Sequence, residues 1–104
     1  MERKSIYGFE MIKKEEMDKI IEKGRVLIVD LRCVEMYRQG HFRNARNFPF
    51  AYIDEWKYEI PEKIPVILYC EHGNQSLLAA RKLSGRKGAV YTVVGGYQSI
   101  KEVR

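Results

Sequence analysis

The sequence predicts an α/β fold with a mainly parallel sheet. Three short apolar segments, at 26–30, 65–70 and 89–94, are rich in β-branched or aromatic residues and lack strict alternation. Such runs are typical of strands buried on both faces of a parallel sheet. Segments with helical spacing lie between them, and strands that alternate with helices form parallel sheets through right-handed crossovers. Two weaker strand candidates, at 5–9 and 45–50, bring the expected sheet to about five strands.

Helices are expected between and after these strands. The segment 13–24 places Met17 and Ile21 on one face and ends at Gly24. The segment 75–85 presents leucines and alanines on one face and carries basic residues toward its C-terminal end, where the helix dipole favours them. Shorter helices are expected at 34–40 and 97–103.

Length and composition predict one soluble globular domain that spans residues 1–104. Hydrophobic residues make up 45% of the chain and charged residues 32%, which is typical of proteins with a single core. The N-terminus has no continuous apolar stretch of the kind found in signal peptides, and no run is long enough to cross a membrane. Two cysteines are too few for a disulfide framework, so we expect a cytoplasmic location.

The net charge of +5 is modest and mostly belongs to residues 26–104. A nucleic-acid-binding protein would be expected to have a denser basic stripe and a recognisable module, and the sequence has neither. A small anionic substrate attracted by a weakly positive field fits the charge better.

Cys70 ends the second apolar segment, where a buried strand gives way to a helix. Ligands of parallel α/β sheets bind at the carboxyl ends of the strands. The turn Cys70-Glu71-His72-Gly73-Asn74-Gln75 leads to Ser76, which we expect to open the helix. Backbone N–H groups of such a turn, together with the helix N-terminus, can surround the sulfur and favour the thiolate, which is the nucleophilic form. The alternative is that Cys70 is a small buried residue that completes a strand.

Three separated motifs resemble the rhodanese family. The loop "CEHGNQS" is similar to the active-site loop of small single-domain bacterial thiosulfate sulfurtransferases. The segment 26–49 resembles a second hallmark, and "VYTVVGGYQSI" resembles the family's strand, double glycine and final helix. The positions that match the second hallmark are Asp30, Arg32, Glu35, Tyr37, Gly40, His41, Ala45, Asn47 and Pro49. The resemblance covers about residues 5–103.

The resemblance implies a three-layer α/β/α fold and a sulfurtransferase that needs no cofactor. Cys70 would attack the outer sulfur of thiosulfate, release sulfite and hold a persulfide. The sulfur would then pass to cyanide or to a thiol, such as that of a thioredoxin-like protein. The backbone amides of Glu71, His72, Gly73, Asn74, Gln75 and Ser76 would bind the substrate and the persulfide.

Phosphatases built on the same fold are the nearest rivals among enzymes. Their loop is one residue longer and ends in an arginine that binds phosphate through two hydrogen bonds. Position 76 would hold that arginine, and here it is Ser76. The sequence therefore disfavours a phosphatase.

Glu71 and His72 stand where many rhodaneses carry a cation. A carboxylate beside a thiolate repels a dianionic donor. Either Glu71 points to solvent and only its amide faces the sulfur, or the loop prefers a different donor. His72 is either a partial cation near neutral pH or merely exposed, and zinc binding is not expected because too few further ligands are available.

The other polar residues of the hallmark are expected to be structural, because an ionised cysteine needs no base to attack sulfur. Asp30 with Arg32, and His41 with Asn47, would fix the loop behind the site. Cys33 is either a resolving thiol or an incidental strand-end cysteine. A second hypothesis for function is a sulfur-relay or interaction module that a partner protein, rather than free thiosulfate, loads with sulfur.

Overall fold

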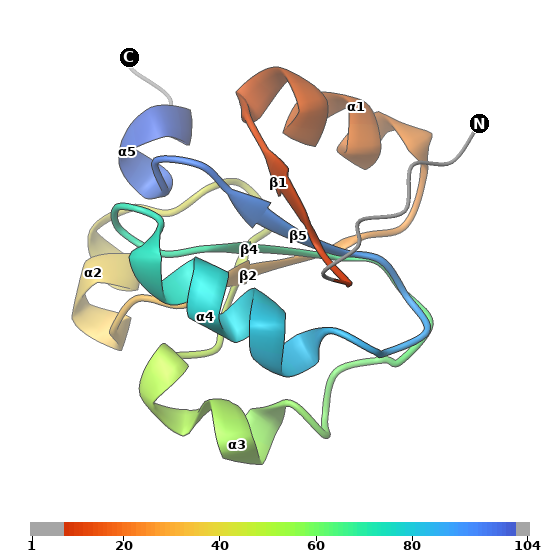
Figure 1. Cartoon of the computed structure of the whole chain (residues 1–104). Helices are drawn as coiled ribbons and strands as arrows, with labels where there is room; N and C mark the ends of the chain where they lie inside the picture. The colour runs from red at the N-terminus through yellow and green to blue at the C-terminus, as the bar shows by residue number, and fades with distance from the viewer. Residues whose placement is uncertain (1–7, 102–104) are drawn as a thin grey trace.

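A computed structural model describes residues 8–101 of the chain. Figure 1 shows a central sheet covered by helices on both faces. The strands are β1 (Glu10–Ile12), β2 (Leu27–Asp30), β3 (Arg46–Asn47), β4 (Val66–Tyr69) and β5 (Val90–Val93). The helices are α1 (Lys14–Lys23), α2 (Val34–Gln39), α3 (Ile53–Trp56), α4 (Asn74–Leu83) and α5 (Tyr97–Ile100), with a 3₁₀ turn, η1, at Phe50–Tyr52.

The five strands form one parallel sheet in the order β1-β5-β4-β2-β3. β4 lies in the middle, and all four of its residues are buried. The predicted parallel sheet of about five strands is therefore confirmed. Because every strand runs in the same direction, their carboxyl ends lie together at one edge of the sheet and their amino ends at the opposite edge.

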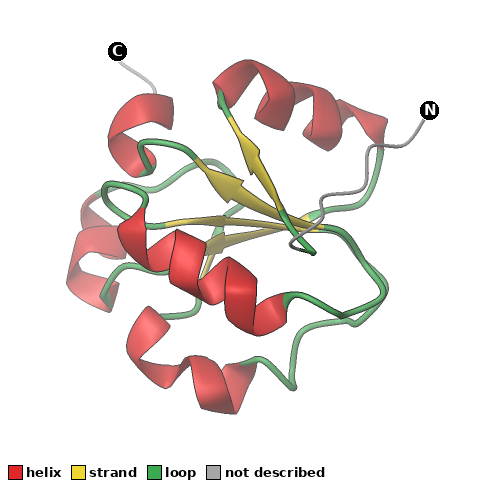
Figure 2. Ribbon diagram, viewed as in Figure 1, coloured by secondary structure: helices red, strands yellow, loops and turns green. Residues whose placement is uncertain are grey.

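Side chains of the inner strands alternate between two cores. Val66, Leu68 and Cys70 face the core beneath α3 and α4. Ile67 and Tyr69 face the core beneath α1 and α5. The two helical layers lie on opposite sides of the sheet in Figure 2, so the expected three-layer arrangement is confirmed. Within the described residues, no helix is long and apolar enough to cross a membrane.

The structure differs from expectation in two segments, one near the amino terminus and one in the middle of the chain. The strand expected at 5–9 lies partly outside the described residues; Gly8 and Phe9 are not in a strand, and β1 begins at Glu10. No helix was expected for residues 50–56, which form η1 and α3. These short turns are stabilised by packing, because Ile53 and Trp56 are buried and the Trp56 indole donates to the Pro49 carbonyl at 2.8 Å.

The start of α4 also differs from expectation. The helix begins at Asn74, two residues before Ser76, and Gly73 caps it with φ of 109°. Glycine adopts this left-handed conformation without the steric cost that other residues meet. The amide of Ser76 therefore belongs to the first turn of α4, where backbone N–H groups have no partner within the helix.

Candidate active site

Cys70 follows the last residue of β4 at the carboxyl edge of the sheet. Successive side chains of a strand point to opposite faces of the sheet, and that of Cys70 points to the same face as Leu68. It therefore joins the core beneath α4. Only 3% of the residue is exposed. The burial matches the alternative reading of a strand-end core cysteine, so the surroundings of its sulfur decide between the two.

The sulfur of Cys70 accepts two backbone hydrogen bonds from the turn that follows it. The amide of Gly73 donates at 3.1 Å and the amide of Ser76 at 3.3 Å. The sulfur thus lies at the N-terminus of a ten-residue helix, whose dipole also favours negative charge there. Backbone donors and a helix N-terminus directed at a sulfur are surroundings typical of nucleophilic cysteines.

Two buried hydroxyl groups hold the turn in this shape. Ser76 is fully buried, and its hydroxyl donates to the Gly73 carbonyl at 3.1 Å. The Thr92 hydroxyl of β5 donates in turn to the Ser76 hydroxyl at 2.8 Å. This chain links the central sheet to the residue whose amide contacts the sulfur. Ser76 also occupies the place where a phosphatase would need its arginine.

The turn between β5 and α5 packs directly on the Cys70 loop. The amide of Tyr97 donates to the Cys70 carbonyl at 2.7 Å, and the amide of Gln98 donates to the Glu71 carbonyl at 3.4 Å. A β-carbon at Gly96 would lie 2.5 Å from the Cys70 carbonyl oxygen. The close approach of the two backbones therefore requires glycine at this position.

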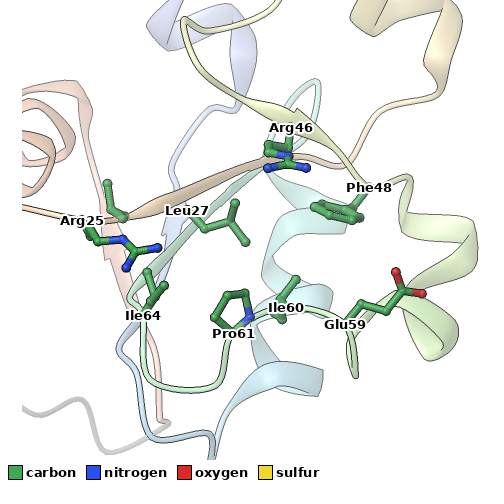
Figure 3. A pocket seen from close by; sticks show the side chains of 9 residues that line it. Arg25, Leu27, Arg46, Phe48, Glu59, Ile60, Pro61 and Ile64 are labelled. Carbon is green, nitrogen blue, oxygen red and sulfur yellow. The ribbon is translucent and has the colours of Figure 1, made fainter.

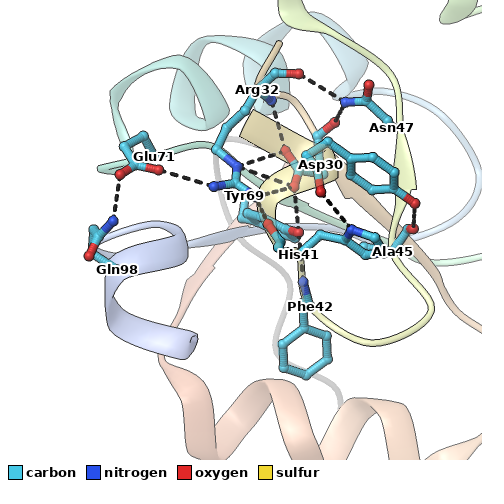
Figure 4. A network of polar contacts seen from close by, with 11 residues as sticks. Asp30, Arg32, His41, Phe42, Ala45, Asn47, Tyr69, Glu71 and Gln98 are labelled. Carbon is cyan, nitrogen blue, oxygen red and sulfur yellow. Dashed lines mark hydrogen bonds and ion pairs between the residues drawn. The ribbon is translucent and has the colours of Figure 1, made fainter. Parts of the chain in front are cut away.

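Arg32 lies at the centre of a buried polar network beside the loop (Figure 4). Its guanidinium donates to both carboxylate oxygens of Asp30, with the shortest contact at 2.8 Å, and to the Gly40 carbonyl at 2.6 Å. Asp30 is fully buried and also accepts the Tyr69 hydroxyl at 2.7 Å. The carbon of the guanidinium lies 4.0 Å from the centre of the Tyr97 ring. A buried charge pair with this many hydrogen bonds fixes the geometry around it.

The network changes the ionisation of two of its members. Burial alone would lower the pKa of Arg32, but hydrogen bonds and charge interactions with Asp30, with a further hydrogen bond to Glu71, raise that pKa above its ordinary value. Burial, followed by the hydrogen bond to Asp30, raises the pKa of Tyr69 well above its ordinary value. Arg32 is therefore always charged, and Tyr69 is neutral at physiological pH.

Glu71 does not point to solvent, which corrects one of the two expectations for this residue. Its carboxylate pairs with Arg32 at 3.2 Å and accepts a hydrogen bond from the Gln98 amide group (Figure 4). The side chain is 27% exposed. The pairing explains how a carboxylate is tolerated beside the cysteine: an arginine from β2's end and a glutamine from α5 hold it.

His41 and Asn47 act separately and do not form the expected pair. The His41 ring stacks on Tyr37 and contacts the Tyr37 carbonyl at 2.8 Å. Asn47 donates to the carbonyls of Asp30 and Arg32 at 3.0 and 2.9 Å. Each therefore fixes a different part of the chain after β2, and their expected structural role remains a prediction.

The remaining loop residues and the second cysteine lie at the surface. His72, Asn74 and Gln75 are exposed. The His72 ring forms no hydrogen bond with any residue between 8 and 101. Cys33 is exposed and precedes α2, and neither it nor Cys70 forms a disulfide. In the described part of the chain, no three His, Cys, Asp or Glu side chains cluster as metal ligands would.

Sequence reasoning missed Thr92 and Gln98 as residues that support the site. Both contact the loop only after the chain has folded, from β5 and α5. A threonine in the apolar segment 89–94 was the available signal, because a buried hydroxyl needs a hydrogen-bond partner.

Comparison with known proteins decides the family, since the Rhodanese-like domain model matches residues 13–103. The chain belongs to the rhodanese-like domain family. It is 30% identical over 95 residues to a thiosulfate sulfurtransferase GlpE of Coxiella burnetii, covering 89% of this chain and 88% of that one. It is 34% identical over 82 residues to a tRNA sulfurtransferase of Desulfurococcus amylolyticus, covering 79% of this chain but 16% of that protein.

The fold of this rhodanese-like domain also matches solved structures. A rhodanese-related protein from Thermoplasma volcanium superposes with a TM-score of 0.78 at 24% identity, covering 88% of this chain and 89% of that one. The sulfurtransferase names of the relatives and the family match place this rhodanese-like domain in a sulfurtransferase family.

Proposed function

We propose that the chain is a thiosulfate sulfurtransferase with Cys70 as its nucleophile. The Cys70 thiolate attacks the outer sulfur of thiosulfate, and the bond between the two sulfur atoms of thiosulfate breaks. Sulfite leaves with the electron pair of that bond, and Cys70 becomes an anionic persulfide. In the second step, cyanide or a thiolate attacks the outer persulfide sulfur, which yields thiocyanate or a new persulfide and restores the Cys70 thiolate. No metal or organic cofactor takes part.

One observation carries the proposal: the Gly73 and Ser76 amides both donate to the Cys70 sulfur. A cysteine that only filled space at a strand end would not need two donors directed at its sulfur. The donors stabilise the attacking thiolate, and the other backbone amides of the same turn stabilise the negative charge of the outer persulfide sulfur. The structural role proposed for Asp30, Arg32, His41 and Asn47 is to keep the neighbouring loop in place.

The small exposure of Cys70 favours a small donor. Only 3% of the residue can be reached from solvent, whereas His72, Asn74 and Gln75 around it are exposed. Thiosulfate presents a single terminal sulfur atom, so it can approach a recessed thiolate without the substrate entering the core. A second small nucleophile can reach the outer sulfur of the persulfide more easily, because that atom extends beyond Cys70.

The test is the rate of thiocyanate formation from thiosulfate and cyanide. We expect the wild-type chain and a Cys33→Ser variant to turn over at similar rates, and a Cys70→Ser variant to be inactive. Hydrogen-exchange protection of β4 in the inactive variant confirms that it is folded. Equal activity in the wild-type chain and Cys70→Ser would contradict the role of Cys70.

A second candidate is a sulfur-relay module that receives its sulfur from a partner protein. One observation favours it: Asp30, Arg32 and Glu71 together carry one more negative than positive charge beside the loop. This excess opposes a dianionic donor more than a protein persulfide, which carries at most one negative charge. Loading by a persulfidated protein with no loading by thiosulfate supports the relay, and loading by thiosulfate alone supports the enzyme.

A further inference from the structure

A cavity lies at the edge of the sheet opposite to Cys70. Its volume is about 390 Å³, and it lies near the amino ends of β2 and β4. Cys70 comes six positions after Ile64, which lies on the cavity wall, and six steps correspond to about 20 Å along an extended strand. The residues that line it are Arg25, Val26, Leu27, Arg46, Phe48, Glu59, Ile60, Pro61 and Ile64. The cavity therefore has no part in the sulfur chemistry described above.

Most of the cavity lining is apolar. Leu27, Phe48 and Ile60 point toward one another in Figure 3, and Pro61 and Ile64 close the lower side of this view. A volume of about 390 Å³ falls within the usual range for small-molecule sites, which are mostly apolar with a few polar groups. The size and lining fit the hydrophobic body of a small molecule.

The wall formed by residues 61–64 is held in place by the loop before β5. The Arg86 guanidinium donates to the Pro61 carbonyl and to the Ile64 carbonyl, the latter at 2.7 Å. The amide of Gly88 donates to the Glu62 carbonyl at 2.8 Å. These bonds cross from one loop to another, so the cavity exists before a ligand binds, which reduces the cost of binding.

Two arginines at the cavity have no charged partner among the described residues. Arg25 and Arg46 are exposed, and neither guanidinium forms a hydrogen bond or ion pair with another residue between 8 and 101. In Figure 3 the two arginines lie on different sides of Leu27, Arg25 beside Ile64 and Arg46 beside Phe48, whereas the Glu59 carboxylate points away from the apolar residues. Guanidinium groups bind carboxylates through paired, charge-assisted hydrogen bonds.

We propose that this cavity binds a small monoanion with an apolar body, with its carboxylate attracted by the guanidinium groups of Arg25 and Arg46 and its hydrocarbon part against Leu27, Phe48 and Ile60. Free inorganic anions do not use the apolar lining, and neutral hydrocarbons do not use the two arginines. Glu59 disfavours ligands with several negative charges. The site is independent of Cys70 and of the proposed sulfur transfer.

The test compares phenylbutyrate with phenylbutanol, which share a hydrocarbon body and differ in charge. Each is titrated into the Cys70→Ser variant, and amide shifts are followed by NMR, so the result does not depend on sulfur transfer. We expect saturable shifts at Leu27, Ile60 and Ile64, with the carboxylate bound about three- to tenfold more tightly than the alcohol, as solvent-exposed charge pairs allow.

Two double variants with the same net charge complete the design. Arg25→Gln with Arg46→Gln is expected to reduce the affinity for phenylbutyrate to that for phenylbutanol. Arg38→Gln with Arg81→Gln removes two exposed arginines on α2 and α4 and should leave both affinities unchanged. Equal affinities for the two probes in the starting protein, an equal loss in both double variants, or shifts confined to residues 70–76 would each overturn the proposal.

Discussion

Arg32 donates to Glu71 at 3.2 Å while it also holds Asp30 at 2.8 Å. One buried guanidinium thus pairs with two carboxylates, one at the end of β2 and one in the loop that follows Cys70. The arrangement ties the two loops at the carboxyl edge of the sheet together. It also leaves one negative charge in excess beside the nucleophile, which gives the first prediction.

Glu71→Gln should increase kcat/KM for thiosulfate by about two- to fivefold. The substitution removes the excess negative charge, and a partly exposed charge contributes modestly to the binding of a dianion. Glutamine retains the shape, and its one carbonyl oxygen can still accept the hydrogen bond from Arg32, while the Gln98 amide can turn its own oxygen toward the new NH2 group. Steady-state thiocyanate formation measures the change, with Glu55→Gln on the exposed face of α3 as the control. Identical kinetics in Glu71→Gln and the wild type would remove Glu71 from any role in donor preference.

Thr92→Val should lower kcat/KM for thiosulfate and destabilise the fold by about 1 kcal/mol. The substitution removes the hydroxyl that donates to Ser76, whose amide contacts the Cys70 sulfur. Thr92→Ser keeps the hydroxyl and should retain most of the activity. Chemical denaturation and steady-state kinetics on both variants distinguish the effect of losing the hydroxyl, in valine, from the effect of losing the methyl group, in serine. If the serine variant loses as much activity as the valine variant, the hydroxyl chain does not position the loop.

Gly96→Ala should destabilise the fold more than Gly85→Ala and should also impair sulfur transfer. Both glycines have positive φ, at 63° and 94°, so both substitutions introduce backbone strain of about 1 kcal/mol. Only at Gly96 would the new β-carbon collide with the backbone of Cys70 and Glu71. Urea denaturation measures the difference, which we expect to be at least about 1 kcal/mol. Equal destabilisation in the two variants would show that the loop does not need this close approach.

Tyr69 should make the fold sensitive to alkaline pH. Its pKa is raised in the folded chain, so its contribution to stability is fully present below the ordinary tyrosine pKa of about 10. As pH rises above about 10, the unfolded chain releases this proton and the folded chain does not, so the free energy of unfolding falls.

The measurement is the free energy of unfolding of wild type and Tyr69→Phe at several alkaline pH values. We expect the wild type to lose up to about 1.4 kcal/mol more per pH unit above pH 10 than the variant does. Tyr69→Phe is less stable near neutral pH because the Asp30 carboxylate loses a donor. Parallel pH profiles would mean that Tyr69 titrates alike in the folded and unfolded chains.

The sequence predicts the sheet and the cysteine loop well because both are encoded locally. Continuous apolar runs mark the buried strands, and the seven residues from Cys70 to Ser76 contain the turn, the glycine and the start of α4. The hydrogen bonds from Gly73 and Ser76 to the sulfur lie within this segment. A reader of the sequence therefore needs no long-range information to expect them.

The orientation of Glu71 could not be predicted in the same way. Its partners Arg32 and Gln98 lie 39 and 27 residues away along the chain, and only the fold brings them together. The helix at Ile53–Trp56 is similar, since it is too short to be stable alone and depends on burial against the sheet. Its apolar residues at i and i+3 were the only local signal.

The mass of the intact chain after incubation with thiosulfate tests the central claim most directly. The experiment uses Cys33→Ser, so that Cys70 is the only thiol, and weighs the desalted protein without reductant. We predict a gain of one sulfur atom that disappears when cyanide is added and that never appears in Cys70→Ser. An unchanged mass in folded protein whose Cys70 still reacts with iodoacetamide would contradict the claim that the sulfur held by Gly73 and Ser76 takes up a second sulfur from thiosulfate.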